Sequence, residues 1–152
     1  SKEKIVTIVD PKKENYDSYR SPTLITPNKT EASEASGISI HDEISLCAAG
    51  KKLVRKWRAQ AVLITRGAEG MSLFRRRAAP KHFPTEPRDV FDVTGAGDTV
   101  VAMCALALAS GDAGFDEAAV LANVAAGFVG DEIGTVAVPA AKIRKLIEDR
   151  DR

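Results

Sequence analysis

Asp92-Val93-Thr94-Gly95-Ala96-Gly97-Asp98-Thr99 is the stretch that decides the fold of this chain. Gly95 and Gly97 flank Ala96 where a long helix of small residues is predicted to begin. Amide N–H groups in the first turn of a helix have no partner inside the helix, and the helix dipole favours negative charge there. Asp98 follows directly and sets a carboxylate beside this anion site. The pairing suits phosphoryl transfer, in which amides hold the phosphoryl charge and a carboxylate accepts the proton of the attacking hydroxyl.

The same residues have a purely structural interpretation, and the sequence leaves both open. A glycine-rich turn followed by Asp in the first helical turn is also good capping chemistry, and short glycine motifs often occur without a ligand. Two other phosphate-binding motifs are excluded. The Rossmann pattern requires a third glycine where this chain has Val100, and no Gly-x-x-x-x-Gly-Lys-Ser/Thr sequence is present.

The complete string from Asp92 to Thr99, followed by small and apolar residues, closely resembles the C-terminal signature of the ribokinase, or PfkB, family of carbohydrate kinases. The resemblance implies an α/β, ribokinase-like fold with a mainly parallel sheet flanked by helices. It covers nearly the whole chain but only the C-terminal half of the family's domain. We therefore expect residues 1–152 to form a single domain, the nucleotide-side part of such a kinase. The resemblance also makes Asp98 the catalytic base and assigns the anion hole to the amides of Gly95, Ala96 and Gly97.

The composition of the whole chain narrows the class of protein. The formal net charge is +1 at pH 7, which predicts neither a nucleic-acid groove nor binding to an anionic membrane surface. No apolar run is long enough to span a bilayer and the first residues do not resemble a signal peptide, so we expect a cytoplasmic protein. Cys47 and Cys104 lie far apart in apolar helical contexts and are predicted to be buried free thiols.

Alternating strand and helix patterns predict a parallel sheet with one short hairpin. Apolar, β-branched runs predict buried strands, and the link before the last of them is too short for a parallel crossover. Residues 75–87 contain Pro80, Pro84 and Pro87 and are predicted to form a loop or an edge strand. The strands are expected over residues 5–9, 23–26, 61–65 and 71–74.

Capping residues and helical spacing predict five helices. They begin at Asn28 (ending at Gly37), at Ser39, at Gly97 (ending at Ser110), at an Asp116 cap (ending near Val129) and at Pro139. The second of these helices is expected to bury one face, formed by Ile44, Cys47, Ala48, Val54 and Trp57. Its other face carries Lys51, Lys52, Arg55 and Lys56, which we interpret as a solvated surface rather than a polyanion site because the net charge is near zero.

Asn28-Lys29-Thr30-Glu31 has the spacing of a capping box, in which Asn28 accepts from the third amide and Glu31 reaches back. This structural role explains both residues. The string Thr-Pro-Asn-x-x-Glu also resembles the family's Asn-x-x-Glu motif, which implies that Asn28 and Glu31 support Mg²⁺ and the phosphates, often through water. The two roles are compatible.

The turn after the third strand matches a Thr-x-Gly-x-x-Gly pattern that, in the family, lies against the nucleotide. Thr65, Gly67 and Gly70 occupy the matching positions, and Arg66 is placed to reach a phosphate of ATP. An ordinary hairpin turn explains the same residues. In the family an equivalent helix lines the adenine pocket, which implies that Asn123 lies beside adenine. A purely structural role, in which the Asn123 amide is hydrogen-bonded within the protein, explains this residue equally well.

The family's monovalent-cation site is matched by Asp92 and Thr94, which implies K⁺ beside the ATP and Mg²⁺ site. The segments Val9-Asp10-Pro11-Lys12 and Leu24-Ile25-Thr26-Pro27-Asn28 look most like the kinase domain of bifunctional ADP-heptose synthases. Those enzymes phosphorylate D-glycero-D-manno-heptose 7-phosphate at its anomeric hydroxyl on the way to lipopolysaccharide precursors.

Three hypotheses follow from the sequence. The first is a sugar kinase present as a partial chain, acting on this heptose phosphate or on another sugar or nucleoside. The second is a non-catalytic nucleotide-binding module. The third is a structural piece that pairs with another chain, either an N-terminal half or a second copy, through an exposed sheet edge.

Overall fold

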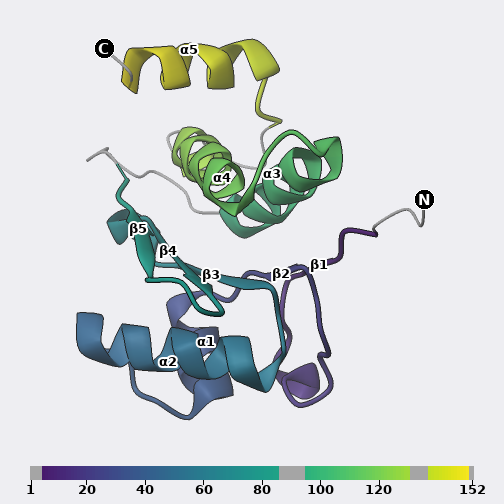
Figure 1. Cartoon of the computed structure of the whole chain (residues 1–152). Helices are drawn as coiled ribbons and strands as arrows, with labels where there is room; N and C mark the ends of the chain where they lie inside the picture. The colour runs from purple at the N-terminus through teal and green to yellow at the C-terminus, as the bar shows by residue number, and fades with distance from the viewer. Residues whose placement is uncertain (1–4, 86–94, 131–136, 151–152) are drawn as a thin grey trace. The chain divides into compact units, whose positions relative to one another are not determined.

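The computed structural model describes residues 5–85, 95–130 and 137–150 of the chain. The chain forms two compact units, Ser1–Phe83 (unit 1) and Pro84–Arg152 (unit 2). Unit 1 holds the sheet with its helices, and unit 2 consists of helices (Figure 1). The described helices include none that is both long enough and apolar enough to cross a membrane.

Unit 1 is built on one sheet whose strands follow the chain order. The strands are β1 (Ile8–Val9), β2 (Leu24–Ile25), β3 (Ala61–Thr65), β4 (Met71–Arg75) and β5 (Lys81–Phe83), in spatial order β1-β2-β3-β4-β5. The pairs β1–β2 and β2–β3 are parallel, whereas β3–β4 and β4–β5 are antiparallel. The predicted α/β architecture and hairpin are confirmed, but the sheet is mixed, since the short turn after β3 forces the chain to reverse.

The first strand is shorter than predicted. β1 holds Ile8–Val9, and Ile5 is 80% exposed. The neighbouring strand β2 explains this length. Pro22 and Pro27 flank the segment that contains β2, and β1 pairs with it over two residues. Beyond the strand, the Thr23 hydroxyl takes over as acceptor of the Thr7 N–H at 3.0 Å.

Two helices, α1 (Lys29–Ser36) and α2 (Glu43–Lys56), lie on the same face of this sheet (Figure 1). Short 3₁₀ turns, η1 (Lys13–Asn15) and η2 (Gly67–Glu69), complete unit 1. Trp57 is fully buried at the end of α2, and its Nε1–H donates to the carbonyl of Tyr16 at 2.7 Å. The core beneath the sheet is formed by Ile25, Ala32, Ala35, Leu46, Leu53, Val54, Ala59, Val62, Ile64 and Phe74 around these two residues.

The prediction that the second helix begins at Ser39 is wrong. Asp42 is the N-cap, and its carboxylate accepts from the Ser45 N–H at 2.7 Å while the Ser45 hydroxyl accepts from the Asp42 N–H. The predicted apolar face is wrong at Ile44, which is 80% exposed, and at Ala48, which is also exposed. Val54 and Trp57 are buried as predicted, and Cys47 is half-buried. The buried stripe is rotated around the helix and consists of Leu46, Ala49, Gly50, Leu53 and Val54.

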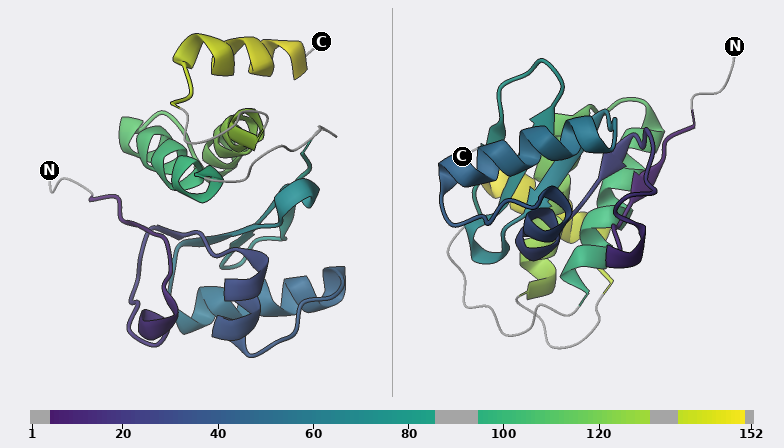
Figure 2. Two further views of the ribbon diagram at one scale, coloured as in Figure 1. Left: turned by 180° about the vertical axis from the view of Figure 1, so that it is seen from behind. Right: turned by 90° about the horizontal axis from the view of Figure 1, so that it is seen from below.

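Unit 2 contains α3 (Ala96–Ser110), α4 (Phe115–Gly130) and α5 (Ala140–Arg150). Helices α3 and α4 lie side by side, and α5 lies over α4 (Figure 2). Val124 and Ala125 of α4 pack with Ile143 of α5. The bounds of α3 are within one residue of the prediction, with Gly111 in a left-handed conformation at its end.

The fourth helix begins one residue before the predicted Asp116 cap. The N–H of Gly114 donates to the Glu117 carboxylate at 2.9 Å, and the Gly114 carbonyl accepts from the Ala118 N–H at 3.0 Å. Gly114 therefore occupies the capping position, and Asp116 lies inside the first turn. The predicted free thiols are confirmed, since Cys104 is buried and Cys47 is half-buried, both without a disulfide.

Candidate active site

The start of α3 has the backbone geometry expected of an anion site. Gly95 precedes the helix with φ 81° and ψ −2°, a left-handed conformation that glycine adopts without strain. The first intrahelical amide bond joins the Thr99 N–H to the Gly95 carbonyl at 2.9 Å. The N–H groups of Gly95, Ala96, Gly97 and Asp98 come before this bond, so they have no carbonyl partner within α3.

Asp98 lies in this first turn and its side chain is exposed, as is Gly97. A Cβ built on Gly97 would meet no atom of the described residues within 4 Å, so the chain is not packed against this position of the first turn in the part that the structure describes. Asp98 is not enclosed in the interior of unit 2. The carboxylate and the bare amides therefore share one accessible end of α3, and the roles assigned to them remain predictions.

Asn28 and Glu31 form the predicted capping box at the carboxyl end of β2. The Glu31 N–H donates to Asn28 Oδ1, and the Asn28 N–H donates to Glu31 Oε2, each at 2.8 Å. Among the described residues, the second carboxylate oxygen of Glu31, Oε1, has no hydrogen-bond or ion-pair partner. The capping role is confirmed, and one oxygen is left for the predicted role beside the phosphates.

The residues of the Thr-x-Gly-x-x-Gly turn lie next to Asn28. An isolated parallel bridge joins Asn28 and Thr65, and the Thr65 N–H donates to the Pro27 carbonyl at 3.0 Å. The carboxyl ends of β2 and β3 thus bring two predicted site segments together at one edge of the sheet. Gly70 has φ 89° and ψ −134°, a conformation essentially limited to glycine. It closes the turn through the Arg66 N–H, which donates to the Gly70 carbonyl at 2.8 Å.

The Arg66 side chain, predicted to reach a phosphate, is engaged within unit 1. Its guanidinium is 6% exposed and pairs with the carboxylates of Glu43 and Glu69. Arg66 Nη1 lies 3.1 Å from His82 Nδ1 and 3.3 Å from the Ser72 hydroxyl oxygen. Glu43 and His82 could not be predicted as partners, because they lie far from Arg66 along the chain and meet it only through the tertiary fold.

Charge around this turn lowers the pKa of Glu69. The Arg66 guanidinium is the main cause, and Lys29, whose Nζ lies 3.7 Å from Glu69 Oε1, adds to it. Glu69 therefore stays ionised and ties the turn after β3 to the start of α1. Ion pairs of Arg66 and Lys29 with Glu69 hold the turn in one conformation. Gly70 has a backbone conformation that other residues adopt only with strain.

Asn123 of α4 is 5% exposed, and its amide makes two hydrogen bonds to the segment that begins unit 2. Its Nδ2–H donates to the Pro84 carbonyl at 3.0 Å, and its Oδ1 accepts from the Thr85 hydroxyl at 3.1 Å. These bonds account for a polar residue in an apolar helix. The predicted role beside adenine is not needed to explain it and remains a prediction.

Two predicted cation ligands, Asp92 and Thr94, lie outside the described residues. Magnesium prefers oxygen ligands, keeps several waters, and is commonly held by one or two carboxylates together with substrate phosphates. Glu31, with its unoccupied oxygen beside Asn28, fits such a role. Within the described parts of the chain, no cluster of three or more His, Cys, Asp or Glu side chains would hold a metal ion by itself.

Comparison with known proteins places the chain in a family. Residues 2–141 match the pattern of the pfkB family of carbohydrate kinases. The chain is 54% identical over 140 residues to the bifunctional protein HldE of Geobacter metallireducens, covering 92% of this chain and 28% of that protein. It is 51% identical over 142 residues to the bifunctional protein HldE of Geobacter sulfurreducens, covering 93% and 29%. The chain thus spans less than a third of the length of these relatives.

Solved structures confirm the fold. Phosphofructokinase-2 from Escherichia coli, in complex with substrates and products, superposes with a TM-score of 0.83 at 21% identity, over 95% of this chain and 47% of that one. Ribokinase from Arabidopsis thaliana, complexed with ribose and ATP, gives a TM-score of 0.81 at 25% identity, over 95% and 48%. The ribokinase-like fold predicted from the sequence is therefore confirmed, and the chain belongs to the pfkB family of carbohydrate kinases.

Proposed function

We propose that this chain supplies the nucleotide side of an ATP-dependent sugar kinase that phosphorylates the anomeric hydroxyl of D-glycero-D-manno-heptose 7-phosphate. The observation that carries the proposal is the start of α3, where three amides without helical partners stand beside the exposed carboxylate of Asp98. Membership of a carbohydrate kinase family supports phosphoryl transfer to a hydroxyl group. The sequence identity of 54% and 51% to two proteins named bifunctional protein HldE supports heptose 7-phosphate as the substrate.

The reaction requires a base and a binding site for phosphoryl charge. Asp98 accepts the proton of the attacking hydroxyl, whose oxygen then forms the new bond to the γ-phosphorus while the bond to the leaving ADP oxygen breaks. The amides of Gly95, Ala96 and Gly97 hold the equatorial oxygens of the transferring group. Because these donors are fixed by the helix, they need no reorganisation as charge develops.

The residues of unit 1 are proposed to hold ATP. Thr65, Gly67 and Gly70 shape the turn at the carboxyl end of β3, the position at which open α/β sheets bind their ligands. Arg66 fixes the turn through Glu69 and Glu43 and is also proposed to contact a phosphate of ATP. Asn28 and Glu31 would support a magnesium ion, which when bound would offset the negative charge of the phosphates.

Binding of the monovalent cation is proposed for Asp92 and Thr94. One solved neighbour, phosphofructokinase-2 from Escherichia coli, is described in complex with potassium. That likeness, at 21% identity, supports the fold and leaves the cation to be tested on this chain. Stimulation by K⁺ over Na⁺ that is lost in Asp92→Asn is the expected result.

One experiment tests the identity of the sugar substrate. The chain is grafted into the Geobacter metallireducens relative in place of the matching segment. Transfer of the γ-phosphate is then measured with heptose 7-phosphate, fructose 6-phosphate and ribose as acceptors. Preferred transfer to heptose 7-phosphate is expected. Preference for another acceptor would replace the substrate, and ATP binding without transfer to any acceptor would favour the non-catalytic nucleotide-binding module.

A further inference from the structure

A concave site lies in unit 1, at the end of the β3–β4 hairpin opposite to Thr65. It has a volume of about 310 Å³ and is lined by Lys51, Val54 and Arg55 of α2 and by Arg75, Arg76, Arg77 and Ala78 at the end of β4. We call this site the basic pocket. In the β3–β4 hairpin Arg75 pairs with Ala61, whereas Met71 pairs with Thr65 at the nucleotide edge. Four residues of strand separate the two ends, or roughly 13 Å at the rise of a β-strand.

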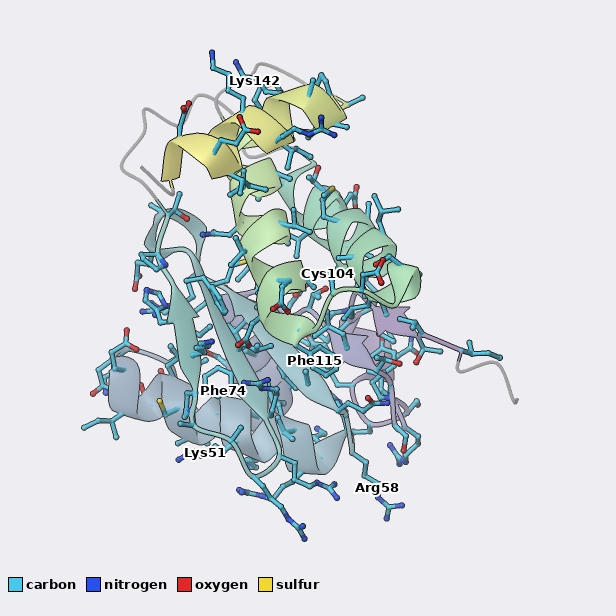
Figure 3. The ribbon with its side chains drawn as sticks, turned by 45° about the horizontal axis from the view of Figure 1, so that its top comes forward. Lys51, Arg58, Phe74, Cys104, Phe115 and Lys142 are labelled. Carbon is cyan, nitrogen blue, oxygen red and sulfur yellow. The ribbon has the colours of Figure 1, made fainter. Side chains whose placement is uncertain are left out.

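Close packing of α2 on β4 fixes the walls of the basic pocket. A Cβ on Gly50 would lie 2.5 Å from the ring of Phe74, so the helix touches the strand at a position where no larger residue fits. Lys51 follows Gly50 directly, and Figure 3 shows it on α2. Val54 and Arg55 lie one turn further along the helix, which brings them beside the residues that follow Phe74. The buried side chain of Val54 gives the pocket an apolar floor.

The charge of the basic pocket is strongly one-sided. Five of its seven lining residues are basic and none is acidic, although the formal net charge of the whole chain is +1. Lys51, Arg55, Arg76 and Arg77 are exposed, and none of them has an ion-pair partner among the described residues. Gathering cations in this way is unfavourable unless an anion offsets the repulsion.

The backbone of the turn is also unusual. Arg77 has φ 60°, a left-handed conformation that long side chains rarely adopt. Such a conformation has an energetic cost, and residues in strained conformations occur mostly at ligand-binding positions. Here it brings three consecutive arginines to one rim, where their guanidinium groups have the planar geometry that binds phosphate oxygens in pairs.

We propose that the basic pocket binds a small molecule that carries two or more linked phosphate groups, which replaces the solvated-surface interpretation that the sequence alone favoured for Lys51 and Arg55. Its volume is at the lower end of the range for small-molecule sites, roughly 300–1,000 Å³. An extended nucleic acid is disfavoured, because no aromatic side chain lines the pocket to stack on bases. The five basic side chains come from two separate elements, α2 and the end of β4, so a molecule with linked phosphates contacts more of them than a single phosphate does. The proposal does not depend on the kinase activity, since it uses none of the residues assigned to that reaction.

The test is a titration of the isotope-labelled 152-residue chain with inorganic tripolyphosphate, followed by NMR, at low and at physiological salt. Amide shifts are expected at residues 51–55 and 75–78. The variant Lys51→Gln/Arg76→Gln removes two lining cations, and we expect its affinity to fall by about tenfold or more, since bonds to charged groups are the strong ones. The matched control Lys52→Gln/Arg58→Gln removes the same charge outside the pocket, and its affinity is expected to change by less than about threefold.

Three results would overturn the proposal. One is an equal loss of affinity in both double variants, which would reduce the effect to general charge. Another is a set of shifts confined to residues 95–98, which would place the phosphates at the start of α3. The third is binding to vesicles of phosphatidylcholine with phosphatidylglycerol but not to tripolyphosphate, which would assign the cations to a lipid surface. Spectra of the two variants without ligand report whether each remains folded.

Discussion

Replacing Gly97 by alanine distinguishes a capping role from an anion site at the start of α3. Gly97 is the second residue of the helix and has no positive φ, so its backbone does not require glycine. The added methyl group would meet no atom of the protein within 4 Å. In the free chain, Gly97→Ala therefore removes a flexible residue from a helix without a steric cost.

The size of the two effects can be estimated separately. Glycine in a helix costs roughly 0.5–1 kcal/mol relative to alanine, so the free energy of unfolding is expected to rise by about that amount. The methyl group would point toward the helix start, so in the proposed anion site it would crowd the phosphoryl oxygens held by the amides. Loss of one well-placed donor in an oxyanion hole lowers turnover by about a hundredfold to a thousandfold, and we expect a loss near the lower end.

Urea unfolding of the chain gives the stability, and γ-phosphate transfer by the grafted Geobacter enzyme gives the turnover. Ala102→Gly is the matched control, because Ala102 is exposed on the same helix and outside the first turn. It should lose the stability that Gly97→Ala gains while keeping turnover. Greater stability of Gly97→Ala with unchanged turnover would refute the anion site and leave capping as the role of the motif.

Two further predictions concern groups with shifted pKa values. Burial raises the pKa of the Cys104 thiol to about 12. Near pH 8, Ellman's reagent should therefore react quickly with half-buried Cys47 in the native chain, whereas Cys104 should react only after unfolding. Two fast-reacting thiols in the native chain would contradict this. The charges of Arg66 and Lys29 lower the pKa of Glu69, so its contribution to stability is present above the ordinary carboxyl pKa and is lost as the pH falls through the lowered value. Arg66→Ala should raise the Glu69 pKa in an NMR titration, and an unchanged value would count against the ion pair.

Local patterns in the sequence were sufficient for several elements. The apolar run at residues 61–65 is β3 as predicted, and the Asn28–Glu31 spacing forms the predicted capping box. Gly95 and Gly111 bound α3 within one residue of the prediction. Each of these features depends on neighbours a few residues away, which is the range over which capping, turn and periodicity rules operate.

Features that depend on distant residues were not predictable. The buried face of α2 was misassigned because several rotations of this helix present apolar residues, and packing against β4 selects the one that carries Gly50. The partners of Arg66 and Asn123 come from other elements, so no spacing along the chain indicated them. The short β1 follows from the prolines around its neighbour, an effect of strand pairing rather than of the β1 sequence itself.

The central claim is that Asp98 is the base that accepts the proton of the sugar hydroxyl. Asp98→Asn keeps the size and the first-turn position of the side chain but removes its basicity. In the grafted Geobacter enzyme we expect turnover to fall by about a hundredfold to ten-thousandfold while the Kd for ATP stays unchanged. Turnover close to that of the unsubstituted enzyme, with the same affinity for ATP, would contradict the account.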